Sequence, residues 1–147
     1  DPVLRESSRL QGAVGMSAQT TVDPADVKAG GILEALNHNM FSNGLKYSNA
    51  KLKTLDIDAE TQKLIDYCSP VKHLDSGDPP ICLIYTGPFS RDTDHIHHSK
   101  LGLLFKKRAD AVGATCTLSV RNEPNYPNPE PNYVLKLLGL TEKDELK

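Results

Sequence analysis

Long apolar runs, tryptophan and blocks of like charge are all missing from this sequence. The clearest apolar run, 81–85, falls far short of the roughly 18 residues that a membrane-spanning helix needs, so no transmembrane or signal segment is visible. The 17 Lys and Arg residues face 19 Asp and Glu residues, which leaves a net charge of -2. A protein that binds duplex nucleic acid needs clustered basic residues, and the nearest approach to a cluster is 106–108. The composition therefore argues against nucleic acid as a partner.

Cysteine is scarce as well. Cys68, Cys82 and Cys116 are an odd number at wide spacing and form no CxxC pair, so no disulfide framework is expected. Cys82 lies in an apolar run and Cys116 in a Thr-flanked one. This setting predicts small buried hydrophobic residues in strands rather than nucleophiles or metal ligands.

The size and the balance of residue types predict one globular domain, 1–147. Hydrophobic residues make up 38% of the chain and charged residues 24%, as in soluble globular proteins, and the 147 residues can bury one ordinary core. The chain begins at Asp1, which we expect of a processed product or of a piece of something longer. A cytoplasmic location and a secreted or periplasmic one both remain open.

The first part of the chain predicts a strand, a helix and a loop. Residues 9–18 are apolar and lie between polar segments, which suits a short buried strand. Asp23 followed by Pro24 is a helix N-cap followed by a first-turn proline, and apolar residues recur after it at helical spacing. Residues 37–55 are polar, Asn-rich and weakly periodic. They predict an irregular loop or a lid-like insertion rather than a core element.

A second helix is expected after the N-cap Asp58, with one apolar face made of Leu64, Ile65 and Cys68. It ends before Pro70.

The remaining elements alternate between strands and helices. The run 81–85 predicts a strand buried on both faces, and 115–120 predicts the next strand. Between them, Ser99 is the expected N-cap of a helix that ends at Gly113, and 133–140 is a short apolar helix. The apolar face of the long helix is made by Leu101, Leu104, Phe105 and Val112. This order predicts an α/β fold with a mostly parallel sheet flanked by helices.

In an open parallel sheet, ligands bind beyond the carboxyl ends of the strands. The loops after Ala18, Gly87 and Arg121 should therefore share one edge of the molecule. The middle loop is rich in ionisable side chains, namely Asp92, Asp94, His95, His97 and His98.

Two motifs at this edge have both a chemical and a structural interpretation. The run DTDHIHH, 92–98, offers imidazole and carboxylate groups for a metal ion, but its spacing is better explained by a solvated helix start. The run GMSAQ, 15–19, matches the nucleophile motif GxSxG except at its last glycine. Ser17 is therefore expected to be a strand-end serine, and no metal or cofactor is predicted.

Three segments taken together resemble the carboxy-terminal half of the α/β-hydrolase esterases and lipases, especially bacterial acetyl-esterase and feruloyl-esterase-like members. DPVLRESSRLQGAVGMSAQTTVDP is similar to the entry into their sixth strand. YCSPVKHLDSGDPPICLIYTG is similar to their seventh strand and its approach. IHHSKLGLLFKKRADAVGATCTLSV is similar to the helix and eighth strand that follow. The resemblance covers most of the chain and implies a partial α/β-hydrolase fold.

The resemblance implies hydrolysis of a small-molecule carboxylic ester by a Ser, Asp and His triad. The acid of such enzymes follows the seventh strand, which points to Asp92, with Asp94 as the alternative. The histidine normally follows the eighth strand, but 121–132 contains none, and His95, His97 and His98 beside the acid are the local candidates. The nucleophile and oxyanion loop lie outside the region matched.

We therefore expect a half-domain that is inactive alone and that needs a second chain, a dimer partner or the absent amino-terminal half. A parallel sheet without those strands exposes an apolar edge. The alternative is a degenerate hydrolase that binds a ligand or partner, or serves a structural role, without catalysis.

Overall fold

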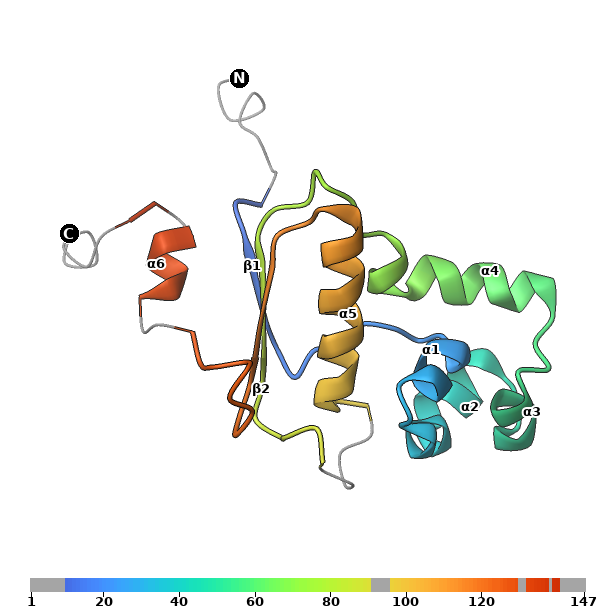
Figure 1. Ribbon diagram of the computed structural model, residues 1–147. Helices are drawn as coiled ribbons and strands as arrows, with labels where there is room; N and C mark the ends of the chain where they lie inside the picture. Colours follow the sequence, from blue (N-terminus) through green and yellow to red (C-terminus); the bar gives the residue numbers. More distant parts are fainter. Residues whose placement is uncertain (1–9, 91–95, 130–131, 138, 141–147) are drawn as a thin grey trace, which may run out of the picture.

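The computed structural model describes residues 10–90, 96–129, 132–137 and 139–140 (Figure 1). Its centre is a three-stranded sheet of β1 (Ala13–Met16), β2 (Ile81–Tyr85) and β3 (Cys116–Val120). The strands lie side by side in the order β1-β2-β3, and both pairs are parallel. The helix α5 (Ser99–Val112) connects β2 to β3. The predicted α/β class and the parallel pairing of β2 with β3 are confirmed.

The strand register sorts the side chains onto two faces. Leu83 lies opposite Leu118, and Tyr85 opposite Val120. All four are buried with Phe105 of α5 in one apolar core. The neighbouring positions point to the other face, where the hydroxyl of Tyr133 in α6 (Tyr133–Leu137) donates to Thr117 Oγ1 at 3.0 Å. Figure 1 shows α5 and α6 on opposite sides of the sheet.

The N-cap of helix α5 lies one residue before the position that the sequence predicts. The N-cap is His98, not Ser99, because the His98 Nδ1 accepts a hydrogen bond from the Lys100 N–H. A histidine ring seldom takes this role, so the small hydroxyl residue was the natural prediction. At the other end, Gly113 adopts a left-handed φ of 78° and closes the helix as expected.

A second core lies in a helical lobe, which is formed by the part of the sequence that connects β1 to β2. It is built by α1 (Pro24–Ala29), η2 (Leu33–Asn37), α2 (Asn39–Leu45) and α3 (Asn49–Thr54). Its buried members include Val27, Leu36, Phe41, Leu52 and Leu101.

The prediction of a loop without core residues for 37–55 is wrong. Phe41 is 1% exposed and Leu52 is fully buried. The helices α2 and α3 are so short that each buries one residue, which leaves no apolar periodicity to detect. His38 and Ser48 cap them by local hydrogen bonds.

Helix α4 (Ala59–Cys68) leads from the lobe to the 3-10 turn η3 (Pro70–Lys72). Asp58 caps it as predicted, with its Oδ1 accepting from the Thr61 N–H at 2.8 Å. Of the predicted apolar face, only Ile65 is buried, while Leu64 and Cys68 are exposed. Figure 1 shows α4 reaching away from the sheet, so only one side of the helix finds a partner.

Strand β1 also differs from its prediction as a buried strand. Val14 is 43% exposed and Met16 is 71% exposed. Both lie on an edge strand and on the sheet face opposite α5. In the part of the chain that the structure describes, no helix is long and apolar enough to cross a bilayer.

The contribution of the Asp58 N-cap to stability should depend on pH. Hydrogen bonds from the Thr61 N–H and from the Tyr47 hydroxyl lower the pKa of Asp58 from 3.8 to about 2. The ionised carboxylate therefore stabilises the folded state above about pH 4, and this contribution is lost as the pH falls toward 2. We expect the difference in urea midpoint between the wild type and Asp58→Asn to stay constant above that range and to shrink below it. A difference that does not change with pH would contradict the assignment.

Candidate functional site

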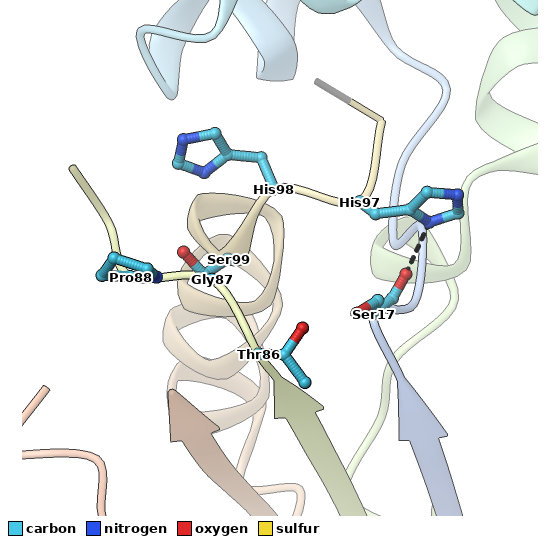
Figure 2. A pocket seen from close by; sticks show the side chains of 7 residues that line it. All are labelled: Ser17, Thr86, Gly87, Pro88, His97, His98 and Ser99. Atoms are coloured by element: carbon cyan, nitrogen blue, oxygen red, sulfur yellow. Dashed lines mark hydrogen bonds between the residues drawn. The ribbon is translucent and has the colours of Figure 1, made fainter. Parts of the chain in front are cut away.

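A small recess lies at the carboxyl edge of the sheet, where the sequence placed its candidate residues (Figure 2). Its walls come from the ends of β1 and β2 and from the start of α5. They are Ser17, Thr86, Gly87, Pro88, His97, His98 and Ser99. The parallel strands create this arrangement, since their carboxyl ends meet at one edge.

Ser17 forms a sharp turn directly after β1. Its φ of 47° is left-handed, a conformation that costs a non-glycine residue free energy. The turn is held because the Ser17 N–H donates to the Ile84 carbonyl at 2.8 Å. A nucleophile elbow leads at once into a helix, but here the next helix, α1, starts only at Pro24. The GMSAQ segment is thus a strand-end turn and not an elbow.

His97 reaches across the recess to this turn. Its Nδ1 lies 2.7 Å from the Ser17 carbonyl oxygen (Figure 2). A carbonyl can only accept, so Nδ1 carries the proton and donates it. In a Ser-His-Asp triad the same nitrogen donates to a carboxylate. The ring of His97 instead holds the main chain of the loop that leaves β1.

His98 has a second structural task in the recess wall. It is 6% exposed, and its Nδ1 accepts from the Lys100 N–H at 3.1 Å. Accepting requires Nδ1 to be unprotonated. Both predicted histidines therefore lie at the expected edge, and the Nδ1 atoms of both bond to the main chain.

Ser99 and Thr86 were not among the sequence candidates. Ser99 is 2% exposed, and its buried Oγ has no hydrogen-bond partner among the described residues. The volume open to the centre of a water molecule is about 10 Å³, which is room for about one water. Thr86 could have been found from the rule that ligands gather after strand ends, whereas Ser99 has no such signal. In this conformation the recess does not admit an ester substrate.

Asp92 and Asp94, the predicted acids, and His95 lie outside the described residues. The structure brings Ser17, His97 and His98 together and does not test the acids. The loop that precedes them is tied to the loop after β3, because the Phe89 N–H donates to Glu123 Oε1 at 3.0 Å.

Tyr85 is a buried residue that holds the loop after β1 in place at this edge. Its ring is 2% exposed, and its hydroxyl donates to the Ala18 carbonyl at 2.5 Å. Burial raises the pKa of Tyr85, so the phenol stays protonated. It fixes the path of the chain after Ser17 and is not an acid or base near neutral pH.

Within the described ranges, no group of three or more His, Cys, Asp or Glu side chains is arranged to hold a metal ion. The DTDHIHH run is only partly covered by those ranges. Comparison of the chain with family models, with curated proteins and with solved structures finds no match.

The three thiols of the chain are expected to differ sharply in reactivity. Cys68 is exposed, whereas Cys82 and Cys116 are buried. Burial raises the pKa of Cys116 to about 11 and also raises that of Cys82, which suppresses the reactive thiolate. At pH 8 we expect Ellman's reagent to react quickly with Cys68 alone, and with all three thiols after unfolding. Rapid reaction of a native Cys68→Ser variant would contradict this burial.

Proposed function

We propose that this chain is part of a carboxylic ester hydrolase of α/β-hydrolase type, in which it supplies the half that carries the acid loop. The observation that carries the proposal is the order of the sheet. The segments that resemble the sixth, seventh and eighth strands of such enzymes are β1, β2 and β3, which lie adjacent and parallel in chain order. The loop with Asp92 and Asp94 follows the middle strand at its carboxyl end.

In this proposal the chain contributes positioning and the acid, while the serine and the oxyanion donors lie on polypeptide outside the 147 residues. The acid, Asp92 or alternatively Asp94, would orient the triad imidazole and stabilise its protonated form while serine attacks the ester carbonyl. His97 would hold the turn at Ser17, and His98 would cap α5. Both tasks are supported by their Nδ1 bonds to the main chain. The triad histidine would then be His95, which lies outside the described residues, or a histidine from outside the chain, since 121–132 lacks one.

A non-catalytic binding protein is the second candidate. It is favoured by the small size of the recess and by the engagement of both histidine Nδ1 atoms with the main chain. A degenerate hydrolase could keep the sheet and use its loops to bind a partner without turning over an ester.

The proposal is tested by measuring ester hydrolysis by two samples. One is the natural protein purified from its source, and the other is the isolated chain. With p-nitrophenyl acetate and a fluorophosphonate label, we expect the isolated chain to show only background. The natural protein should turn over the ester and should be labelled on a serine outside the chain. Asp92→Asn should lower kcat about 10³- to 10⁴-fold, as loss of the orienting acid does in other triads.

Asp94→Asn distinguishes the two carboxylates, and Asp56→Asn is the matched control. The Asp56 side chain is 73% exposed, lies on the helical lobe and pairs only at 3.8 Å with Lys51. Turnover by the isolated chain that Ser17→Ala abolishes would overturn the proposal. A natural protein with neither turnover nor labelling would overturn it in favour of the binding protein.

A further inference from the structure

We infer that the recess at the start of α5 binds a carboxylate, one oxygen of which enters the space beside Ser99 while the rest of the ligand lies at the mouth. The inference concerns binding alone. It is compatible with the proposed hydrolase and with the binding protein that is its alternative, and it does not depend on ester hydrolysis.

The hydroxyl of Ser99 is a buried polar group that lacks a partner. Ser99 is 2% exposed, and among the described residues no atom forms a hydrogen bond with its Oγ. A buried hydroxyl in this state costs free energy until a water or a ligand atom bonds to it. Ser99 is one of the residues that line the recess (Figure 2). We therefore expect its missing partner to occupy the recess.

The first turn of α5 leaves a second donor at the same residue. The first four N–H groups of a helix have no partner within the helix. His98 satisfies two of them, because its Nδ1 accepts from the Lys100 N–H at 3.1 Å and its carbonyl accepts from the Leu101 N–H at 2.9 Å. In the part of the chain that the structure describes, no hydrogen bond uses the Ser99 N–H. Ser99 thus offers both its N–H and its hydroxyl.

Thr86 adds a third donor from the end of β2. It follows Tyr85 directly and lines the recess. Within the described ranges, its hydroxyl makes no hydrogen bond. Figure 2 shows this hydroxyl pointing away from the strand end, on the side where His97 and His98 lie. A strand end and a helix start therefore bring hydroxyl donors to one recess.

The charge at this site favours an anion. The aligned peptide dipoles of the 14-residue helix α5 place partial positive charge at its N-terminus. None of the residues that line the recess is acidic, and the first turn of α5 contains no acidic residue. By contrast, α1 and α4 each have an Asp cap and an acidic residue in the first turn, namely Asp23 with Asp26 and Asp58 with Glu60. A cation would be repelled here, whereas an anionic oxygen can accept from every donor named.

Size and charge together select a carboxylate. The innermost space has room for about one oxygen atom, since only about 10 Å³ is open to the centre of a water molecule. About 210 Å³ of empty space, part of it open solvent, surrounds this point and can take the rest of a small ligand. No Lys or Arg side chain is among the lining residues, whereas sites for the more highly charged phosphate commonly use them. A carboxylate carries one charge and can insert one oxygen.

Titration with acetate, followed by NMR, tests the site in the whole natural protein, isotopically labelled. Chloride keeps the ionic strength constant, and the amide signals of 97–99 report binding at the recess. We expect these signals to shift and to reach saturation with acetate. Acetamide, which has nearly the same shape but no charge, should leave them in place. Inorganic phosphate should bind more weakly than acetate.

Two variants remove one donor each. Ser99→Ala deletes the buried hydroxyl without adding bulk, and Thr86→Val replaces a hydroxyl by a methyl group. Each should weaken acetate binding about tenfold or more, as the loss of a hydrogen bond to a charged group does. Ser42→Ala is the matched control, because the Ser42 hydroxyl lies on α2 and bonds only to the Asn39 carbonyl. Circular dichroism verifies that each variant is folded, and Thr86→Val decides if Ser99→Ala is not.

Several results would overturn the inference. If acetate causes no shift, or if acetamide causes the same shift, the recess holds only an internal water. Tighter binding of phosphate than of acetate would contradict the carboxylate class. Unchanged acetate affinity in the folded Ser99→Ala variant would place the binding elsewhere.

These results are separable from those of the activity test. A protein that turns over an ester but binds no acetate at 97–99 would contradict the carboxylate site alone. A protein that binds acetate there without turnover or labelling would contradict the proposed hydrolase alone.

Discussion

Gly102→Ala is expected to lower the free energy of unfolding by about 2 kcal/mol or more, although alanine is the better helix former. Gly102 lies in α5 where the helix presses on β2 and β3. A Cβ added there would collide with the Tyr85 ring and would lie 2.9 Å from Leu118 Cδ1. Neither side chain can retreat, because both are buried in the sheet core.

Gly44→Ala is the matched control for this substitution. Gly44 lies in α2 and has no atom within 4 Å of the position that its Cβ would take. Its replacement should raise stability by about 0.5 to 1 kcal/mol, as expected of helix propensity alone. Urea unfolding of both variants measures the contrast. A stabilised Gly102→Ala variant would show that α5 does not approach the sheet this closely.

The same contact matters for the recess. Tyr85 anchors the chain after Ser17, and His98 and His97 are the N-cap of α5 and the residue before it. Moving α5 outward would therefore shift two walls of the recess together. We expect Gly102→Ala to disturb the NMR signals of both histidine rings as well as stability.

Leu101→Ala is expected to cost about 2 to 5 kcal/mol, the range for a buried leucine that leaves a cavity. Leu101 is 2% exposed and points from α5 into the core of the helical lobe, beside Leu36 and Phe41. The next buried apolar position on α5, Phe105, belongs to the sheet core instead. Leu101 is thus a link between the two cores.

Amide hydrogen exchange distinguishes this role from a general loss of packing. Exchange should accelerate more at Phe41 and Leu52 in the lobe than at Leu83 and Leu118 in the sheet. The exposed Leu64→Ala is the control and should change stability by less than about 0.5 kcal/mol. Uniform acceleration in both cores would contradict a lobe that can loosen by itself.

The elements with local signals could be predicted from the sequence. The strand 81–85 is an unbroken apolar run between prolines and a glycine. The N-caps Asp23 and Asp58 and the C-cap Gly113 bond to neighbours no more than four residues away. Local hydrogen bonds and continuous burial leave a readable pattern along the chain. The strand-helix-strand order also predicted the parallel pairing and the edge that gathers the loops.

Which distant residues come into contact depends on how the elements pack together. The bond from His97 to Ser17 joins positions 80 residues apart, and the bond from Thr20 to Leu101 joins positions 81 apart. No spacing rule predicts such pairs. The burial of Phe41 and Leu52 was hidden for a related reason, since each short helix contributes one apolar residue to a core assembled from several helices.

The exposure of β1 is another property that the sequence did not predict. Its sequence is as apolar as that of a buried strand, and only the strand order reveals that it lies at the edge with one face uncovered. Apolar composition reports what a strand can bury, whereas burial itself depends on which neighbours are present. For this chain, therefore, the local elements follow from the sequence, while the recess and the free edge exist only once distant segments pack together.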